Sequence, residues 1–137
     1  MKRNWDLLRH FLIEVEEEKD IFAGFPDKPE WTEQTEEEYS RQCKEYEEYE
    51  SHFFGHLELL TENGYIDGIN VLRSMDGYIS CGTTYPRLTM KGHDLLDTMR
   101  SSPVWESIKS TARSKGIELT FDAIKALGAV ALRHLIN

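Results

Sequence analysis

The stretch Leu88–Asp97 constrains the fold of this chain more than any other part of its sequence. It reads LTMKGHDLLD, so a strand-like segment runs directly into a helical pattern. Leu95, Leu96 and Met99 recur with the spacing of one helical face, and Thr89 stands where a helix N-cap is expected. A strand that passes into a helix through one short turn favours a hairpin packed beside that helix. The sequence therefore predicts an α+β fold that is mostly helical.

The first 34 residues predict a helix followed by an irregular arm. Residues 1–18 show apolar side chains at helical spacing, with Asn4 as the candidate cap. Because Glu16, Glu17 and Glu18 put negative charge at the negative end of the helix dipole, we expect that end to fray. Residues 19–34 contain glycine and prolines that break a helix. The arm carries three aromatic residues that we expect to anchor it to the core: Phe22, Phe25 and Trp31.

Residues 35–64 predict either one long helix or two helices with a bend near Ser51. Thr35 opens a candidate capping box, and the pair Asn63 and Gly64 provides the stop. The first half is rich in glutamate and polar nearly all round, whereas the second half has a broad apolar face. We therefore expect the second half to lie in the core.

The remaining residues predict a hairpin and further helices. Residues 65–88 have β-type character on both sides of a turn at Met75–Gly77, and residues 89–137 carry helical signals. The whole pattern predicts one domain over residues 1–137, with a winged helix-turn-helix core, a β-hairpin wing and additional C-terminal helices. An apolar face in the last helix suits either packing within the chain or a homodimer; it includes Leu127, Val130 and Leu132.

Cysteine usage and the absence of long apolar runs indicate the compartment. Cys43 and Cys81 form no metal-binding or redox pattern and fit a reducing cytoplasm. The N-terminus lacks the apolar core of a signal peptide, and no apolar run approaches the roughly 18 residues that span a bilayer. We therefore expect a cytoplasmic protein that does not enter a membrane. We also expect that it uses no cofactor.

Four blocks of sequence carry a resemblance to a known family. They are MKRNWDLLR from Met1, GHLELLTENGYI from Gly55, the stretch Leu88–Arg100 followed by a Val-Trp pair, and the segment Gly116–Leu127. In this order they resemble a family of short uncharacterised proteins of bacteria and their prophages, grouped as a domain of unknown function with the signature L-T-W-x-G-H-E-F-L-D. Met90 replaces the aromatic residue of that signature. The resemblance implies a winged-helix fold and a mobile-element origin, and it implies no established activity.

A histidine pair and a histidine with neighbouring aspartates are the candidates for chemistry. His52 and His56 are four residues apart, which can place two zinc ligands on one helical face, but the glutamate of a metalloprotease motif is missing between them. His93 lies beside Asp94 and near Asp97, at the start of a predicted helix whose positive end explains the aspartates. No nucleophile or phosphate-binding loop accompanies either group. We therefore expect no catalytic residue, no bound metal and no enzymatic activity.

The charge distribution argues against insertion of the long helix into DNA. Residues 1–69 hold 7 lysines and arginines against 19 aspartates and glutamates, whereas the rest of the chain holds 9 against 6. The predicted recognition helix, from Glu47 to Asn63, has no lysine or arginine, so it would set carboxylates against phosphates. DNA binding then depends on cations around the wing, and the candidates are Arg73, Arg87 and Lys91.

The glutamate-rich first half of the long helix is the main candidate for a binding surface. We expect a protein partner, and the residues proposed to contact it are Glu36, Glu37, Glu38, Tyr39, Glu45, Tyr46, Glu47, Glu48, Tyr49 and Glu50. A row of carboxylates with aromatic side chains fits a basic surface and can imitate the phosphates of nucleic acid. With the mobile-element resemblance, this predicts a protein that inhibits nucleic-acid-handling host defence machinery. The alternative is a DNA-binding transcriptional regulator that contacts DNA through its wing.

Overall fold

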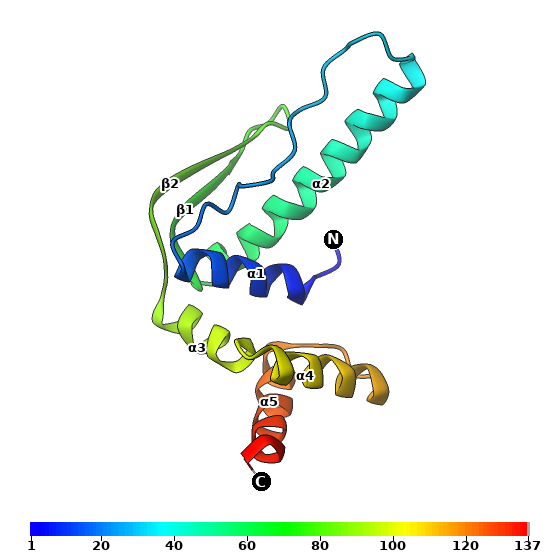
Figure 1. Ribbon diagram of the computed structural model, residues 1–137. Helices are drawn as coiled ribbons and strands as arrows, with labels where there is room; N and C mark the ends of the chain where they lie inside the picture. Colours follow the sequence, from blue (N-terminus) through cyan, green and yellow to red (C-terminus); the bar gives the residue numbers. More distant parts are fainter. Residues whose placement is uncertain (137) are drawn as a thin grey trace.

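The computed structural model describes residues 1–136, and its elements follow the predicted order (Figure 1). They are α1 (Trp5–Glu16), α2 (Glu36–Glu62), β1 (Ile66–Arg73), β2 (Ile79–Leu88), α3 (Met90–Met99), α4 (Ser102–Lys115) and α5 (Phe121–Ile136). Most of the described residues lie in helices, which confirms the mostly helical α+β fold. The last residue, Asn137, was predicted to belong to the C-terminal helices and lies outside the described residues.

The caps predicted from the sequence form as expected. The Asn4 side chain accepts a hydrogen bond from the backbone N–H of Leu7, and the Thr35 side chain accepts one from Glu38. Gly64, which follows α2, has a φ of 76°, and Gly116, which follows α4, has a φ of 66°. Both glycines take the left-handed conformation that ends a helix at least cost. Between its two ends α2 is one continuous helix, so the alternative with a bend is wrong.

The end of α1 differs from the prediction. The helix stops at Glu16 rather than at residue 18, and its end is capped rather than frayed. The backbone N–H of Lys19 donates to the Glu14 carbonyl at 2.9 Å, while Glu18 turns the chain with a left-handed φ of 57°. This is the hydrogen-bond pattern of a Schellman cap, with a glutamate where glycine is usual. The Arg100 guanidinium also pairs with the Glu16 carboxylate, which offsets the unfavourable charge at the end of the helix.

The hairpin is antiparallel and contains one irregularity. Ile66 pairs with Leu88 at its base and Arg73 with Ile79 at its tip, in agreement with the predicted strands and turn. The register shifts between Asp67 and Ile69, where Gly68 has a φ of 84° and approaches the backbone of the opposite strand. A bulge of this kind increases the local twist of a hairpin.

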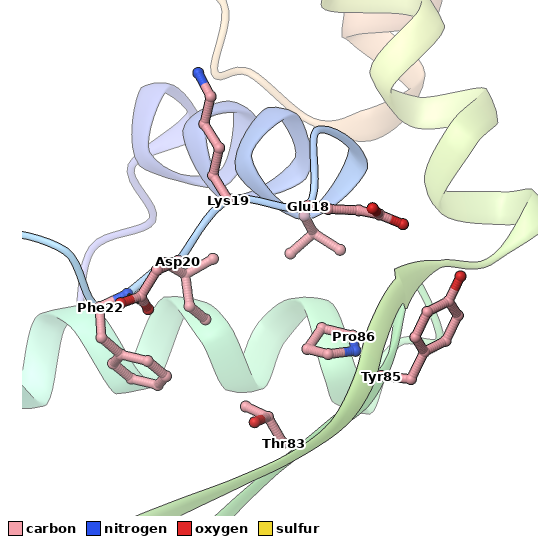
Figure 2. A pocket seen from close by; sticks show the side chains of 9 residues that line it. Glu18, Lys19, Asp20, Phe22, Thr83, Tyr85 and Pro86 are labelled. Carbon is pink, nitrogen blue, oxygen red and sulfur yellow. Dashed lines mark hydrogen bonds between the residues drawn. The ribbon is translucent and has the colours of Figure 1, made fainter.

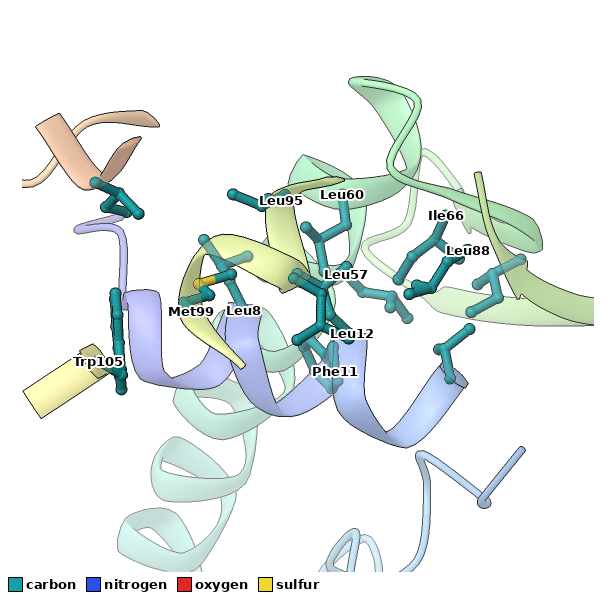
Figure 3. Packing of buried hydrophobic residues seen from close by; sticks show 14 of the residues in the cluster. Leu8, Phe11, Leu12, Leu57, Leu60, Ile66, Leu88, Leu95, Met99 and Trp105 are labelled. Atoms are coloured by element: carbon teal, nitrogen blue, oxygen red, sulfur yellow. The ribbon is translucent and has the colours of Figure 1, made fainter. Parts of the chain in front are cut away.

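The core lies where α1 crosses α2 and α3, and every element contributes to it (Figure 3). Its fully buried side chains are Phe11, Leu12, Leu57, Leu60, Leu95, Leu96, Met99, Trp105, Ile108 and Ile124. Trp105 also donates from its indole nitrogen to the Asp6 carboxylate at 2.8 Å, which fixes α4 against the start of α1. In the arm, Phe22 and Phe25 pack against Phe53 and Phe54 of α2, as predicted. The prediction is wrong for Trp31, which is 58% exposed and contacts Tyr39 outside the core.

The junction at Leu88–Asp97 joins the hairpin to the helices. The backbone N–H of Thr89 donates to the Tyr65 carbonyl at 3.1 Å, and its side chain caps α3 at Gly92. Gly92 lies directly against the Tyr65 carbonyl, where a Cβ atom has no room. The arrangement of α1, α2, the hairpin and α3 is consistent with a winged-helix-like core. The connection between α1 and α2 is the long arm rather than the short turn of a helix-turn-helix unit.

Candidate partner-binding surface

The first half of α2 projects away from the core. In Figure 1, residues 36–50 extend beyond α1, with the arm and the hairpin tip as their neighbours. The buried residues of α2 all lie in its second half, from Phe53 to Leu60. The core therefore holds the second half and presents the first half to its surroundings, as the change of composition along this segment predicts.

The glutamates and tyrosines of this half-helix occupy different sides of it. The exposed glutamates are Glu36, Glu37, Glu38, Glu45, Glu47 and Glu48, and we name this set the acidic face. Tyr39 contacts Trp31 at 5.4 Å between ring centroids, and Tyr46 and Tyr49 contact Phe25 at 6.2 and 5.4 Å. The tyrosines therefore hold the arm against α2, although Tyr49 remains 46% exposed. Of the residues predicted to contact a partner, six of the seven glutamates and Tyr49 are exposed, whereas Glu50, Tyr39 and Tyr46 are half-buried.

Nearly all of the acidic face lacks a compensating cation. Arg41 and Glu45 lie 3.9 Å apart, and both side chains are more than two-thirds exposed. Within residues 1–136, none of Glu36, Glu37, Glu38, Glu47 and Glu48 takes part in an ion pair. The resulting negative potential attracts positively charged surfaces and repels phosphate.

A cleft of about 670 Å³ borders the acidic face, between α2, the arm and the hairpin tip. Glu47 and Glu50 line it from α2 and Asp76 from the hairpin, while Lys28 lies over the Tyr78 ring at 5.4 Å. Burial and the neighbouring Glu50 carboxylate raise the pKa of Tyr46, so this phenol stays protonated. The cleft brings the hairpin tip next to the acidic face.

Arg73, the candidate DNA contact at the hairpin tip, is occupied within the chain. Its guanidinium donates to both carboxylate oxygens of Glu58 on α2, with a shortest distance of 2.6 Å. The Glu58 hydrogen bonds raise the pKa of Arg73, and the charges of Glu50 and Glu62 add to this effect. Arg73 therefore lies in an acidic environment that disfavours phosphate.

The other two candidate cations lie at the base of the hairpin. Arg87 donates to Asp67 on the opposite strand at 2.6 Å. Lys91 donates to the Asn63 carbonyl at 3.0 Å and lies 4.6 Å above the Tyr65 ring. Arg73 is six residues along β1 from Asp67, which is about 20 Å at ~3.3 Å per residue. The structure does not bring the three cations together into one basic patch.

His56 is a structural residue of the helix interface. It is fully buried, its Nε2 accepts a hydrogen bond from the Asn4 backbone N–H at 2.7 Å, and its Nδ1 donates to the His52 carbonyl at 2.7 Å. Burial lowers the pKa of His56, which favours the neutral ring. Because backbone groups occupy both ring nitrogens, neither is free to bind a metal, while His52 is exposed.

His93 belongs to a charged cluster that joins α1 to α3. Its Nδ1 lies 3.4 Å from the Glu16 carboxylate, which also pairs with Arg100, and Arg100 pairs in turn with Asp97. The Arg100 hydrogen bond lowers the pKa of Glu16. In the described part of the chain, no three acidic, histidine or cysteine side chains are placed to hold a metal ion, and none of its helices has the length and apolarity to cross a membrane.

Residues 1–136 form a small, mostly helical α+β fold with one hairpin, and the sequence assigns the chain to a family. The chain belongs to the family described as "Hypothetical protein (DUF2513)", whose sequence profile matches residues 2–118. It is 28% identical over 144 residues to a protein of Haemophilus influenzae named "Uncharacterized protein", with 99% of each chain covered. No solved structure matches the chain at a significant level. These matches confirm the expected membership in a domain-of-unknown-function family.

Proposed function

We propose that this protein is a non-enzymatic binding protein whose acidic face contacts a basic surface of a protein partner. The observation that carries the proposal is the lack of ion-pair partners for five of the six exposed glutamates, in the part of the chain that projects from the core. Exposed carboxylates without an ion-pair partner stay hydrated, and their negative charge is free to pair with a cationic surface. They steer such a surface into contact and discriminate against acidic competitors.

The partner class follows from the chemistry of this face. A helix that presents exposed carboxylates over several turns resembles a line of phosphates, so the complementary surface is one that otherwise binds nucleic acid. We infer that the partner is a nucleic-acid-handling protein, and a component of host defence machinery in keeping with a phage or mobile-element origin. Two apolar residues of α5, Val130 and Leu132, are also exposed, and we keep a homodimer through α5 as part of the proposal.

A DNA-binding regulator is the alternative, and the cations of the hairpin argue against it. Arg73 and Arg87 are each held by a carboxylate, and the hairpin tip lies next to the acidic face. A wing that approached DNA would therefore bring unpaired glutamates toward the phosphates. Binding through the wing also depends on cations that lie at opposite ends of the hairpin.

Two variants of equal charge test the proposal. The acidic-face variant replaces Glu36, Glu37, Glu47 and Glu48 with Gln. The control variant replaces four other exposed carboxylates with amides: Asp94, Glu106, Glu118 and Asp122. Proteins captured from a bacterial lysate by the wild-type chain and by each variant are quantified by mass spectrometry, and each partner that depends on the acidic face is then purified.

The purified partner gives the decisive readout. We expect a basic protein whose affinity falls about tenfold or more with the acidic-face variant, changes little with the control variant, and weakens between about 50 and 200 mM salt. Equal affinity for the two variants would remove the acidic face from the interaction and refute the proposal. Circular dichroism of both variants establishes that α2 remains folded.

A further inference from the structure

A second feature of the surface is a pocket of about 430 Å³ at the base of the hairpin, away from the acidic face. Figure 2 shows it between the chain that leaves α1 and the end of β2. One wall comes from Glu18–Phe22 and the other from Thr83, Tyr85 and Pro86. Its volume lies in the range of sites that hold small molecules or single side chains.

Two residues of this pocket have a backbone conformation that usually requires glycine. Glu18 has a φ of 57° and Tyr85 a φ of 50°, and no other non-glycine residue of the described chain has a positive φ. They come from different elements, one from the cap of α1 and one from the bulge of β2, yet both line the same pocket. Backbone strain of this kind gathers at functional sites, because the side chain is kept at the expense of the backbone.

The pocket combines apolar walls with an uncompensated carboxylate. Val15, Ile21 and Pro86 supply apolar surface, and Phe22 closes the end opposite Glu18 and Tyr85 (Figure 2). Lys19 points away from the pocket and pairs with Glu17 at 2.8 Å, so it does not neutralise Glu18. Glu18 has no ion-pair partner within residues 1–136, and the Tyr85 ring is 70% exposed beside it.

We propose that this pocket binds an arginine side chain of the protein partner. The inference rests on the proposed function, in which the partner surface is basic. The aliphatic stem of the arginine lies along Val15, Ile21 and Pro86, its guanidinium pairs with the Glu18 carboxylate, and its planar face stacks on Tyr85. Charge complementarity selects a cation, and the combination of carboxylate and aromatic ring selects the planar guanidinium over the ammonium of lysine.

The test uses a small probe in place of the partner. Nα-acetyl-arginine amide is titrated into the ¹⁵N-labelled full-length chain, and amide shifts are followed by NMR. Nα-acetyl-citrulline amide, which has nearly the same shape without the charge, is the control probe. We expect arginine amide to bind with a dissociation constant on the order of several millimolar, as is reasonable for one side chain, and to shift the amides of residues 15–22 and 83–86. Citrulline amide shifts none of them, and Nα-acetyl-lysine amide binds several-fold more weakly.

Three variants locate the binding. Glu18→Gln removes the charge and is expected to weaken arginine amide about tenfold, and Tyr85→Gly removes the ring while relieving the backbone, so the fold is kept. Glu118→Gln removes an exposed carboxylate outside the pocket and is expected to leave the titration unchanged. Equal binding of arginine and citrulline amides, or unchanged binding by Glu18→Gln, would overturn the proposal.

The arginine titration and the partner-binding experiment on the acidic face can give different outcomes. The four glutamine substitutions in the acidic-face variant leave every residue of the pocket in place, so we expect them to leave the arginine titration unchanged. If Glu18→Gln binds the purified partner like the wild type while the acidic-face variant does not, the pocket inference is refuted and the proposed function stands. If arginine amide binds the pocket while the acidic-face variant and the control variant bind the partner equally, the proposed function is refuted and the arginine site in the pocket stands.

Discussion

Replacing His56 with leucine tests whether the N-terminal helix is held to α2 through the imidazole. His56 is fully buried, and its Nε2 accepts the backbone N–H of Asn4, the residue that caps α1. Leucine has a similar volume and fills the space, but it offers no acceptor. The Asn4 N–H then loses its partner in a partly buried position, which costs about 1–3 kcal/mol.

The expected destabilisation is about 2 kcal/mol, because the His52 carbonyl is still in a helix and keeps its backbone partner. For a domain of this size, that corresponds to a decrease in Tm of roughly 6–8 °C. Chemical and thermal unfolding at pH 7.5 measure it. The control is His52→Leu, an exposed position one turn away, where a change within about 0.5 kcal/mol is expected.

The free energy that His56 contributes to stability decreases as the pH falls. Burial lowers the folded-state pKa of His56 below its ordinary value of 6.5, so the unfolded chain takes up the proton first as the pH falls. The stability that His56 contributes is complete above about pH 6.5 and is lost below it, by up to about 1.4 kcal/mol per pH unit, until the folded-state pKa is reached. His56→Leu lacks this loss, so the difference in stability between the two proteins narrows between pH 7 and pH 5.

Two results would refute this reasoning. One is a His56→Leu protein as stable as the wild type at pH 7.5, which would mean that the Asn4 contact contributes nothing. The other is a constant difference in stability from pH 7 to pH 5, which would mean that the imidazole is not kept neutral by burial. The carboxylates of lowered pKa do not interfere, because they titrate below this range.

Three further predictions concern two backbone positions and one side-chain contact between helices. Glu18→Gly is expected to raise the free energy of unfolding by about 1 kcal/mol, because glycine takes the left-handed conformation freely, while arginine binding is lost; denaturant unfolding measures the first effect. Gly92→Ala is expected to cost several kcal/mol, since a Cβ atom meets the Tyr65 carbonyl, and Gly82→Ala, which meets nothing within 4 Å, is the control. Equal stability of the two alanine variants would contradict the packing of α3 on the hairpin. Asp6→Asn weakens two contacts to α4 and removes a carboxyl of lowered pKa. The wild type is therefore expected to be the more stable protein at neutral pH and to lose this difference in stability as the pH falls below about 4. Acid unfolding curves of both proteins measure it.

The elements could be predicted from the sequence because their signals are local. Asn4 and Thr35 cap helices through their own side chains, and Gly64 and Gly116 end helices through their own backbone freedom. The run at Leu88–Asp97 likewise contains both the strand end and the cap of α3. Such signals act within a few residues, so one chain read alone is enough to find them.

The candidate site depends on contacts between distant residues, and here the sequence was less informative. The pairing of Arg73 with Glu58 joins residues that no short pattern relates, and it changes the meaning of a cation in the wing. The tyrosines of α2 alternate with glutamates in sequence, but the arm covers one side of the helix and separates the two sets.

The pocket at the hairpin base was missed for a related reason. Left-handed glycines have a sequence signal, whereas Glu18 and Tyr85 adopt that conformation within a helix cap and a bulge, at residue types that give no such signal. The sequence signal nearest to the pocket is the set of three glutamates at the end of α1, whose unfavourable charge predicts fraying. One of these glutamates, Glu18, lines the pocket.

Binding to duplex DNA, measured by fluorescence anisotropy at about 50 and 200 mM salt, tests the central claim most directly, because phosphate-driven binding is strongest at low salt. We expect that the wild-type chain does not bind DNA even at the lower salt concentration, since five of the six glutamates of the acidic face are unpaired and Arg73 and Arg87 are each held by a carboxylate. Affinity that falls steeply with salt, and that is lost when Arg87 and Lys91 are replaced with glutamate, would contradict it and identify a DNA-binding regulator.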